Sequence, residues 1–211
     1  MVTDLELLWR EARRLGRGRA SRKPLPRLLF FTDPVRTPDP GAVLSRLPRG
    51  SGVVFRAFGA ADAIEVGRRL GRIARRRGLV FLVGADAALA VAVRADGVHL
   101  PERLAHRAGV NRRLRRRFIV TAAAHDLPAV RRSRRSGVDA VVISPVFASE
   151  SRSAGRPLGP RRFAGLVRAA AIPVYGLGGI DARSSRRLSH SGAAGLAAIG
   201  AFVESGGPSR T

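Results

Sequence analysis

The stretch "IPVYGLGGIDARS" (residues 172–184) decides the fold. β-prone residues run directly into Gly176, Gly178 and Gly179, and Asp181, a residue type that begins helices, follows at once. Glycine is favoured where the backbone turns through positive φ, so this order is typical of a strand that ends in a tight turn before a helix. The segment therefore predicts one β-turn-α unit whose turn is built of glycines, which carry no side chains.

Working outward, similar units fill the chain. Apolar, β-prone runs that each precede a helical pattern lie at residues 27–33, 52–58, 79–84, 96–100, 117–122, 138–144, 172–178 and 193–200. Apolar strands that alternate with helices must pair in parallel, because each crossover returns the chain to the same end of the sheet. Eight units in 211 residues predict a compact TIM (β/α)8 barrel. The alternative is a doubly wound open sheet, but "FFTDPVR" (30–36) follows the first strand in place of a dinucleotide-binding glycine motif.

The first residues precede the barrel pattern. We predict that residues 1–26 form an N-terminal helix and a basic linker, and that residues 27–211 form the barrel domain. We expect the added helix to lie across the bottom of the barrel.

The net charge of +24 first suggests a nucleic-acid partner. However, Lys23 is the only lysine, and the arginine runs at 67–78, 112–117 and 131–135 fall on amphipathic stretches. No aromatic-interleaved basic sheet or zinc-binding spacing accompanies them. The pattern favours solvated helix faces, so nucleic-acid binding is not expected.

The sequence also bears on the compartment. With no cysteine, the chain has neither a disulfide framework nor a thiolate zinc site. No apolar run reaches 18 residues, and the N-terminal stretch is charged throughout. We therefore expect a cytoplasmic protein without a membrane partner, and whether it forms a homo-oligomer is left open.

Two strand ends carry the strongest indication of a ligand. Chemistry in a TIM barrel sits at the C-terminal ends of the strands, and phosphate is often held after strands seven and eight. Gly178 and Gly179 end the seventh predicted strand, and Ile199 and Gly200 end the eighth. Bare backbone amides can bind an anion where no Cβ blocks its approach. We predict a phosphate cup at these four residues, for a small phosphorylated molecule.

Several ordered segments resemble the thiamine phosphate synthase and TenI family, over roughly residues 27–203. These segments are "LLFFTD" (28–33), "ALAVAVRADGVHLP" (88–101), "GVDAVVISPVFASESRSAGRPLG" (137–159), "IPVYGLGGI" (172–180) and "GAAGLAAIGAF" (192–202). Synthases of this family join a pyrimidine methyl diphosphate to a thiazole phosphate with Mg²⁺, whereas TenI relatives isomerise a thiazole phosphate or have no settled activity. The resemblance implies that the cup holds the thiazole phosphate.

On the diphosphate side the chain departs from the family pattern. The Gln-x-Arg-x-Lys motif expected at the second strand is replaced by Val54, Arg56 and Phe58, so only the arginine remains. The positions of the two metal-binding acids fall on Ala85 and Leu104, although Asp86 and Glu102 lie nearby. A hard cation needs carboxylate oxygens. We therefore predict no metal site, with Mg²⁺ required only if the synthase reaction is retained.

Polar residues remain in two other places. Ser149, Ser151 and Arg152 match the family's Thr-x-Thr-Lys loop after the sixth strand, so the resemblance implies that the serines bind substrate and that Arg152 contacts phosphate. His125 matches a histidine used as acid or base in TenI tautomerases, and imidazole titrates near neutral pH. We predict His125, Arg56 and Arg152 as catalytic.

The remaining histidines, His99, His106 and His190, lack metal-binding spacing and are assigned no chemistry. Two readings of the function stay open: an enzyme of thiamine biosynthesis, either a transferase or a thiazole tautomerase, and a phospho-ligand binding or regulatory protein without turnover.

Overall fold

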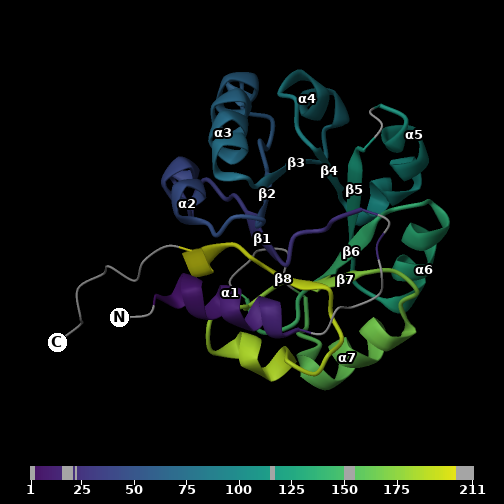
Figure 1. Cartoon of the computed structure of the whole chain (residues 1–211). Helices are drawn as coiled ribbons and strands as arrows, with labels where there is room; N and C mark the ends of the chain where they lie inside the picture. The colour runs from purple at the N-terminus through teal and green to yellow at the C-terminus, as the bar shows by residue number, and fades with distance from the viewer. Residues whose placement is uncertain (1–2, 16–20, 22, 115–116, 150–154, 203–211) are drawn as a thin grey trace.

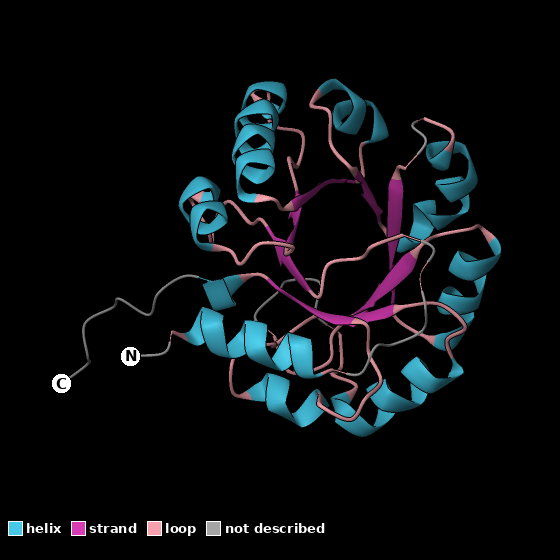
Figure 2. Ribbon diagram, in the orientation of Figure 1, coloured by secondary structure: helices cyan, strands magenta, loops and turns pink. Residues whose placement is uncertain are grey.

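The chain folds into a closed barrel. A computed structural model describes residues 3–15, 21, 23–114, 117–149 and 155–202. Within these residues eight strands pair in parallel with their neighbours in chain order, and β8 closes on β1 (Figures 1 and 2). The strands are β1 (Leu28–Phe31), β2 (Gly52–Phe55), β3 (Val80–Gly84), β4 (Gly97–Leu100), β5 (Ile119–Ala124), β6 (Ala140–Ile143), β7 (Val174–Gly176) and β8 (Gly195–Ala198). The predicted TIM barrel is confirmed.

Helices surround the strands (Figure 2). In the described part of the chain the α-helices are α1 (Asp4–Arg14), α2 (Pro40–Arg46), α3 (Ala63–Arg77), α4 (Ala87–Ala92), α5 (Ala108–Arg112), α6 (Leu127–Arg135) and α7 (Gly159–Ala169). Short 3-10 helices are η1 (Glu102–Arg107), η2 (Ser184–Leu188) and η3 (Gly200–Phe202). The helical pattern after the seventh strand is thus realised only as the single tight turn η2.

Aspartates begin several of these helices. The side chains of Asp39, Asp86 and Asp126 accept backbone hydrogen bonds at the first turns of α2, α4 and α6, at 3.1, 2.8 and 2.7 Å. Each cap satisfies an amide that the helix itself leaves unpaired. The helix starts therefore follow directly from Asp placement in the sequence.

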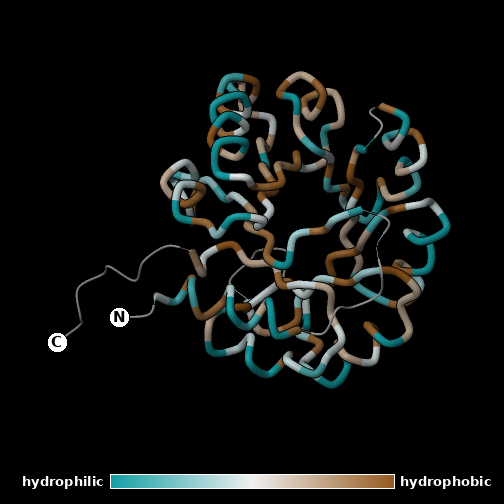
Figure 3. The backbone as a smooth tube through the Cα atoms, in the orientation of Figure 1, coloured by the Kyte–Doolittle hydropathy of each residue, from teal (hydrophilic) through white to brown (hydrophobic). Residues whose placement is uncertain are grey.

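Two apolar layers hold the barrel. Alternate strand residues point inward and fill the lumen: Leu29, Phe31, Val54, Leu82, Ile119, Ala140, Val142, Tyr175 and Ala197. The other strand residues pack outward against the apolar stripes of the helices. Figure 3 shows this as hydrophobic strands inside a ring of helices with hydrophilic outer turns. Because the lumen is packed, a ligand site must lie at a barrel end.

The helix α1 does not cross the bottom of the barrel, so that expectation is wrong. It lies in the outer ring, packed against β8, η2 and η3 (Figure 1). In the described residues β8 is followed only by the three-residue η3, which leaves the outer face of β8 open. The buried side chains of Leu8, Ala12 and Leu15 cover that side, so α1 takes the place of a closing helix.

Residues 23–26 lie at the bottom of the barrel instead. The ammonium group of Lys23 lies 2.7 Å from Oδ2 of Asp139 and also donates to the carbonyl of Phe118. The hydroxyl of Tyr175, inside the lumen, donates to the carbonyl of Pro26 at 2.5 Å. These contacts fix the chain just before β1 against the starts of β5, β6 and β7.

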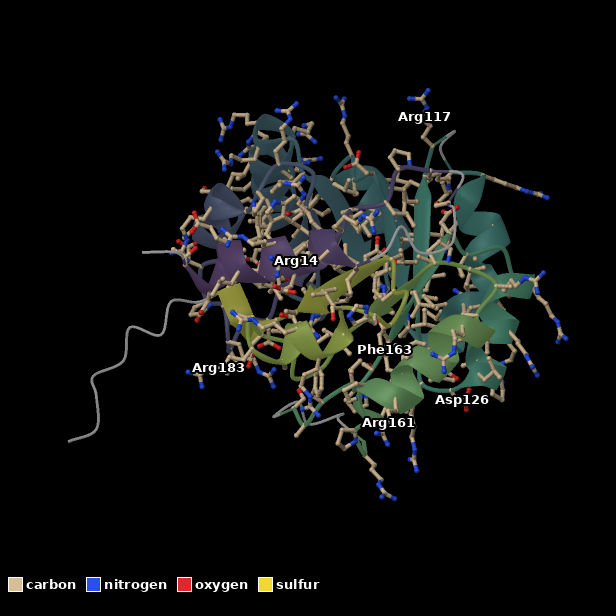
Figure 4. The ribbon with its side chains drawn as sticks, turned by 60° about the horizontal axis from the view of Figure 1, so that its bottom comes forward. Arg14, Arg117, Asp126, Arg161, Phe163 and Arg183 are labelled. Atoms are coloured by element: carbon tan, nitrogen blue, oxygen red, sulfur yellow. The ribbon has the colours of Figure 1, made fainter. Side chains whose placement is uncertain are left out.

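The arginine excess lies on the surface, as predicted. The arginines within α3 and α6 are exposed, and Figure 4 shows Arg117, Arg161 and Arg183 pointing away from the barrel. Among the described residues, no helix is long and apolar enough to cross a membrane.

Candidate functional site

The turn after β7 is locked to the loop after β6. Gly178 and Gly179 have φ of +95° and +60°. A Cβ on Gly178 would lie 2.8 Å from Cα of Pro145, and one on Gly179 would lie 2.2 Å from the carbonyl oxygen of Ala148. The amides of Val146 and Phe147 donate to the carbonyls of Leu177 and Gly178, at 2.8 and 3.0 Å. Both glycines are therefore required by this close packing, a reason that the sequence did not reveal.

The carbonyls of this turn are used, but its amides are not. No hydrogen bond from the Gly178 or Gly179 amide is found in the part of the chain that the structure describes. Gly200, at the end of the neighbouring β8, is exposed, and a Cβ there would meet nothing within 4 Å. Unused amides beside an open space are what an anion requires. The β7 end thus offers donors, and the β8 end offers open space, where the phosphate cup was predicted.

Asp181 makes the turn rigid. Its Oδ1 accepts from the amides of Arg183 and Ser184, at 2.8 and 2.7 Å. The hydroxyl of Ser184 donates in turn to the carbonyl of Gly179 at 2.8 Å. Asp181 therefore bonds the backbone of the turn that leads into η2, and Ser184 holds the Gly179 peptide in place.

His125 lies at the same end of the barrel, after β5. Its Nδ1 is 2.7 Å from the carbonyl oxygen of Ser144, at the end of β6. A carbonyl can only accept, so Nδ1 carries the proton and Nε2 keeps the lone pair in the neutral ring. Ser144 leads directly into the loop that packs on Gly178. The same loop therefore contacts both the imidazole of His125 and the turn after β7.

The exposed face of His125 borders a groove of about 710 Å³. The groove runs between η1 and α6 and is lined by Glu102, Arg103, Ala105, His106, His125, Arg132, Arg135 and Ser136. Across it, Arg132 pairs with Glu102 at 2.9 Å. A larger open cavity, about 1210 Å³, lies at the opposite end of the barrel beside Lys23 and Phe118. Because TIM-barrel chemistry sits at the C-terminal strand ends, the His125 side is the candidate site.

Arg56, at the end of β2, is held from several sides. Its Nη2 lies 3.0 Å from Oδ2 of Asp33, and its Nε donates to the carbonyl of Thr32 at 2.6 Å. Its guanidinium carbon lies 6.0 Å from the ring centre of Phe31 and 5.0 Å from that of Phe58. This arrangement was not predicted, because Asp33 stands 23 residues before Arg56.

The electrostatics of this end follow from those contacts. Burial alone would raise the pKa of Asp33, but amide bonds from Arg36 and Val35 and the charge of Arg56 outweigh it, so that pKa is lowered. Burial lowers the pKa of Arg56, and Asp33 opposes that shift. Both groups stay charged near neutral pH as an ion pair.

Beneath them, His99 lies inside the lumen. Its ring meets that of Phe31 edge-on at 4.9 Å, and its Nδ1 lies 3.0 Å from Oγ1 of Thr121. Burial, and secondarily the charge of Arg56, lowers the pKa of His99 to about 3. His99 is therefore neutral, and the prediction that it has no catalytic chemistry stays a prediction.

The carboxylates near the mouth do not fit a magnesium site. Asp86 caps α4, Glu102 pairs with Arg132, and Asp33 pairs with Arg56. Among the described residues no three His, Cys, Asp or Glu side chains come together as metal ligands. A hard divalent cation requires several converging oxygen ligands. These carboxylates already have other partners, and the prediction of no metal site stays a prediction.

The loop after β6 is described only in part. Ser149 is half-buried. It directly follows Ala148, whose carbonyl oxygen packs against Gly179 of the β7 turn. Ser151 and Arg152, predicted to bind substrate and phosphate, lie outside the described residues.

Comparison with known proteins agrees with this geometry. The fold defines an α/β barrel of the TIM type. Residues 42–202 match the family model for thiamine monophosphate synthase, TMP-TENI. The chain belongs to the thiamine monophosphate synthase and TenI family, whose members bind phosphorylated thiamine precursors and typically use Mg²⁺.

Individual relatives lie at moderate distance. The chain is 31% identical over 143 residues to a putative thiamine-phosphate synthase 2 of Aquifex aeolicus, covering 68% of this chain and 76% of the relative. It is 30% identical over 166 residues to a thiamine-phosphate synthase of Geobacillus thermodenitrificans, covering 73% and 72%. The solved thiamine phosphate pyrophosphorylase of Pyrococcus furiosus superposes with a TM-score of 0.73 at 25% identity, over 87% of this chain and 90% of that one.

Proposed function

We propose that this chain binds a thiazole phosphate monoester at the C-terminal ends of β7 and β8 and moves a proton on its ring, as a TenI-type member of its family. One observation carries the proposal: the Gly178 and Gly179 amides have no acceptor in the described part of the chain. Two oriented amides beside an open surface stabilise a dianion, because the donors are fixed before the ligand arrives.

The roles of the cup residues follow from that geometry. Gly178 and Gly179 donate to the phosphate from one side, and Ile199 and Gly200 bound it from the other. Ser149 supports the rim from the β6 loop. Ser151 and Arg152 are proposed to complete the grip, with the guanidinium of Arg152 as a bidentate phosphate ligand.

Proton transfer falls to His125. Its Nδ1 proton is fixed on the Ser144 carbonyl, which leaves Nε2 as the base. We propose that Nε2 removes a proton from one ring position of the thiazole and that the resulting imidazolium returns it at another. The peptide carbonyl keeps the ring orientation constant through both steps.

The transferase reaction of the family has less support here. A departing diphosphate needs cations or a metal to stabilise its charge, worth several kcal/mol. Arg56 remains the candidate for that role from the sequence, but its charge is paired with Asp33. We therefore propose thiazole-phosphate chemistry without transfer to a pyrimidine diphosphate.

A second candidate is a phospho-ligand binding protein without turnover. It is favoured by the partner of His125, which is a neutral carbonyl rather than a carboxylate. Such a partner orients the imidazole, but it does not form an ion pair with the imidazolium as a carboxylate would. This arrangement is therefore compatible with a His125 that only helps to bind the ligand.

Calorimetry tests the cup. We expect thiazole phosphate to bind with the same affinity with and without Mg²⁺, and Gly200→Ala to weaken binding because its Cβ enters the open space. Strict dependence on Mg²⁺, or no binding at all, would overturn the proposal.

Hydrogen exchange tests the base. In D₂O, the enzyme should exchange an acidic ring hydrogen of thiazole phosphate, followed by proton NMR. His125→Asn keeps a donor toward the Ser144 carbonyl but removes Nε2, so we expect exchange to slow by roughly 10²-fold or more. Normal binding with no exchange above background would instead favour the binding protein.

An assay with both substrates distinguishes a tautomerase or a binding protein from a thiamine phosphate synthase. Incubation with pyrimidine methyl diphosphate, thiazole phosphate and Mg²⁺ should yield no thiamine phosphate above background. Steady turnover would restore the transferase and with it the predicted role of Arg56.

A further inference from the structure

The larger cavity of the barrel lies at the N-terminal ends of the strands, opposite to the candidate site. It has a volume of about 1210 Å³, and its apolar wall comes from the starts of β3 and β5, where Leu79 and Phe118 are almost fully buried. The charged residues that line it are Lys23, Arg75, Arg94, Asp96 and Arg117. Four of these are basic and one is acidic, so the lining is cationic. We call this space the bottom cavity.

Two of the charges in the lining are already used. The ammonium group of Lys23 pairs with Asp139 at 2.7 Å. Oδ2 of Asp96 accepts the amide of Phe81 at 2.8 Å, which holds the carboxylate against β3. Because Asp139 balances Lys23 and Asp96 balances one arginine, two net positive charges remain among the lining residues.

Three arginines of the bottom cavity carry charges that no neighbour pairs with. In the part of the chain that the structure describes, no side-chain hydrogen bond or ion pair of Arg75, Arg94 or Arg117 is found. Arg117 extends away from the barrel, so it lies at the rim (Figure 4). Arg49 borders the same wall, since a Cβ on Gly78 would lie 3.0 Å from its guanidinium carbon. Guanidinium groups bind phosphate oxygens bidentately, so this set favours a phosphorylated ligand.

The backbone at Arg94 is unusual. Its φ of +57° is left-handed, directly after the end of α4, where glycine is preferred. The amides of Arg94 and Ala95 donate to the carbonyls of Val91 and Ala90, at 3.0 and 2.8 Å, and close the turn. A side chain is disfavoured in this conformation, so an arginine here lowers stability relative to glycine.

Two other helices end in the same turn, but with glycine. Gly78 after α3 has a φ of +65°, and Gly137 after α6 has a φ of +82°. At each of them the glycine amide donates three residues back and the next amide donates five residues back, as at Arg94. The chain thus uses glycine at two of these turns and arginine at the third. This difference supports a role for the Arg94 side chain other than in folding.

The spacing of the arginines indicates the size of the anion. Arg75, Arg94 and Arg117 precede three consecutive strands, β3, β4 and β5. Neighbouring strands lie about 4.8 Å apart, so the first and third of these turns are about 10 Å apart. A single phosphate group does not reach across that distance, whereas two or three linked phosphates can be held by long arginine side chains. The apolar wall excludes water on one side and strengthens each contact.

We propose that the bottom cavity binds the di- or triphosphate group of a small molecule, with Arg75 and Arg94 as its principal ligands and Arg117 at the rim. This site is independent of the proposed function, because the two sites lie at opposite ends of the barrel. It requires neither the glycine turns nor His125. Attraction of a nucleic acid to the arginine-rich surface as a whole is a different outcome, and the variants below distinguish it.

Calorimetry with tripolyphosphate and with inorganic phosphate, without divalent cations and at constant ionic strength, tests the size of the anion. We expect tripolyphosphate to bind roughly tenfold more tightly or better, because it contacts more than one arginine. Equal affinities would overturn the proposal. A parallel titration with ATP identifies the source of the phosphates: binding tighter than that of tripolyphosphate assigns the site to a nucleotide, and weaker binding assigns it to an inorganic polyphosphate.

Arg75→Ala has a matched control in Arg76→Ala. Arg76 carries the same charge at the next position of α3 and is exposed, but it does not line the bottom cavity. We expect tripolyphosphate affinity to fall by roughly tenfold in R75A and by less than about twofold in R76A. Equal losses in the two variants would mean diffuse attraction to the basic surface and would overturn the site.

Arg94→Gly separates binding from folding. Glycine removes the cation and relieves the positive φ, so the midpoint of thermal unfolding should stay the same or rise. Tripolyphosphate affinity should nevertheless fall by roughly tenfold. Unchanged affinity in this variant would contradict the assignment of Arg94.

Asp96→Asn should act in the opposite direction. Asparagine keeps an oxygen for the Phe81 amide but removes the acid of the lining, so tripolyphosphate affinity should rise severalfold. An affinity that stays the same or falls in D96N would argue against an anion in this cavity.

Discussion

The two halves of the barrel mouth use similar backbone positions in opposite ways. At β7 and β8 the turns carry glycine, and the Gly178 and Gly179 amides have no acceptor in the described chain. At β1 and β2 the side chains of Asp33, Arg56 and Phe58 contact one another, and their charges largely cancel. One half is prepared for an anion and the other is not.

The difference shows why a retained residue does not establish a retained function. Arg56 matches the family's diphosphate motif, yet its partner Asp33 decides what its charge can do. The glycines of the β7 turn match too, and their geometry leaves donors available. Neighbouring contacts, rather than residue identity, separate the two cases.

The largest expected effect comes from the glycine half. Gly179→Ala places a methyl group against the Ala148 carbonyl at φ +60°, so we expect the free energy of unfolding to fall by roughly 3 kcal/mol. Urea denaturation measures it.

Gly200→Ala is the matched control, since its Cβ would meet nothing within 4 Å. Its stability should change by less than about 0.5 kcal/mol. If the two alanine variants were equally stable, the interlocking of the β6 and β7 loops would be refuted.

The second effect is a pH dependence of stability in the β1–β2 half, where His99 lies beneath Arg56. His99 has a folded pKa of about 3 and an ordinary value of 6.5, so the unfolded chain binds a proton that the folded chain refuses. Stability from this residue is complete above pH 6.5 and is lost as pH falls toward 3, by up to about 1.4 kcal/mol per pH unit.

Replacing His99 with Gln removes the titrating group. We expect a shallower slope of unfolding free energy between mildly acidic and neutral pH than in the wild type, measured by urea denaturation. His106→Gln, at an exposed helical position, controls for removal of a histidine elsewhere. Parallel slopes for all three chains would mean that His99 accepts a proton in the folded state.

The smallest effect lies at the cap of the β7 turn. Asp181→Ala removes the acceptor for the Arg183 and Ser184 amides, so we expect a loss of about 1 kcal/mol. Because Ser184 also holds the Gly179 carbonyl, phosphate affinity should fall modestly in the same variant. Calorimetry and denaturation together check this, and Asp62→Ala is a control, since Asp62 precedes α3 without a side-chain cap bond. A loss of stability in D62A equal to that in D181A would argue against the cap.

The barrel itself was predictable because strand pattern is local. Each strand is largely apolar and alternates with a helical segment, so eight units and parallel pairing follow from short windows of sequence. The place of α1 was not predictable: its apolar stripe shows that it packs, but only the three-residue η3 after β8 shows where.

The site divides in the same way. The glycine turns at β7 and β8 are visible in the sequence, and the cap that Asp126 makes on α6 joins residues only three positions apart. The pairing of Asp33 with Arg56 depends on two strand ends meeting across the closed barrel, which no short window reports. The predicted domain boundary and cytoplasmic location stay predictions, and the oligomeric state stays open.

The position of α1 has a consequence for how the chain is made. A ribosome releases residues 4–14 long before residues 195–202, yet the former cover the latter. The first helix must therefore wait, with its apolar side uncovered, until the final strand has been synthesised and has joined β1 and β7. Barrel closure in this protein is a late event of translation, in which the earliest and latest segments meet.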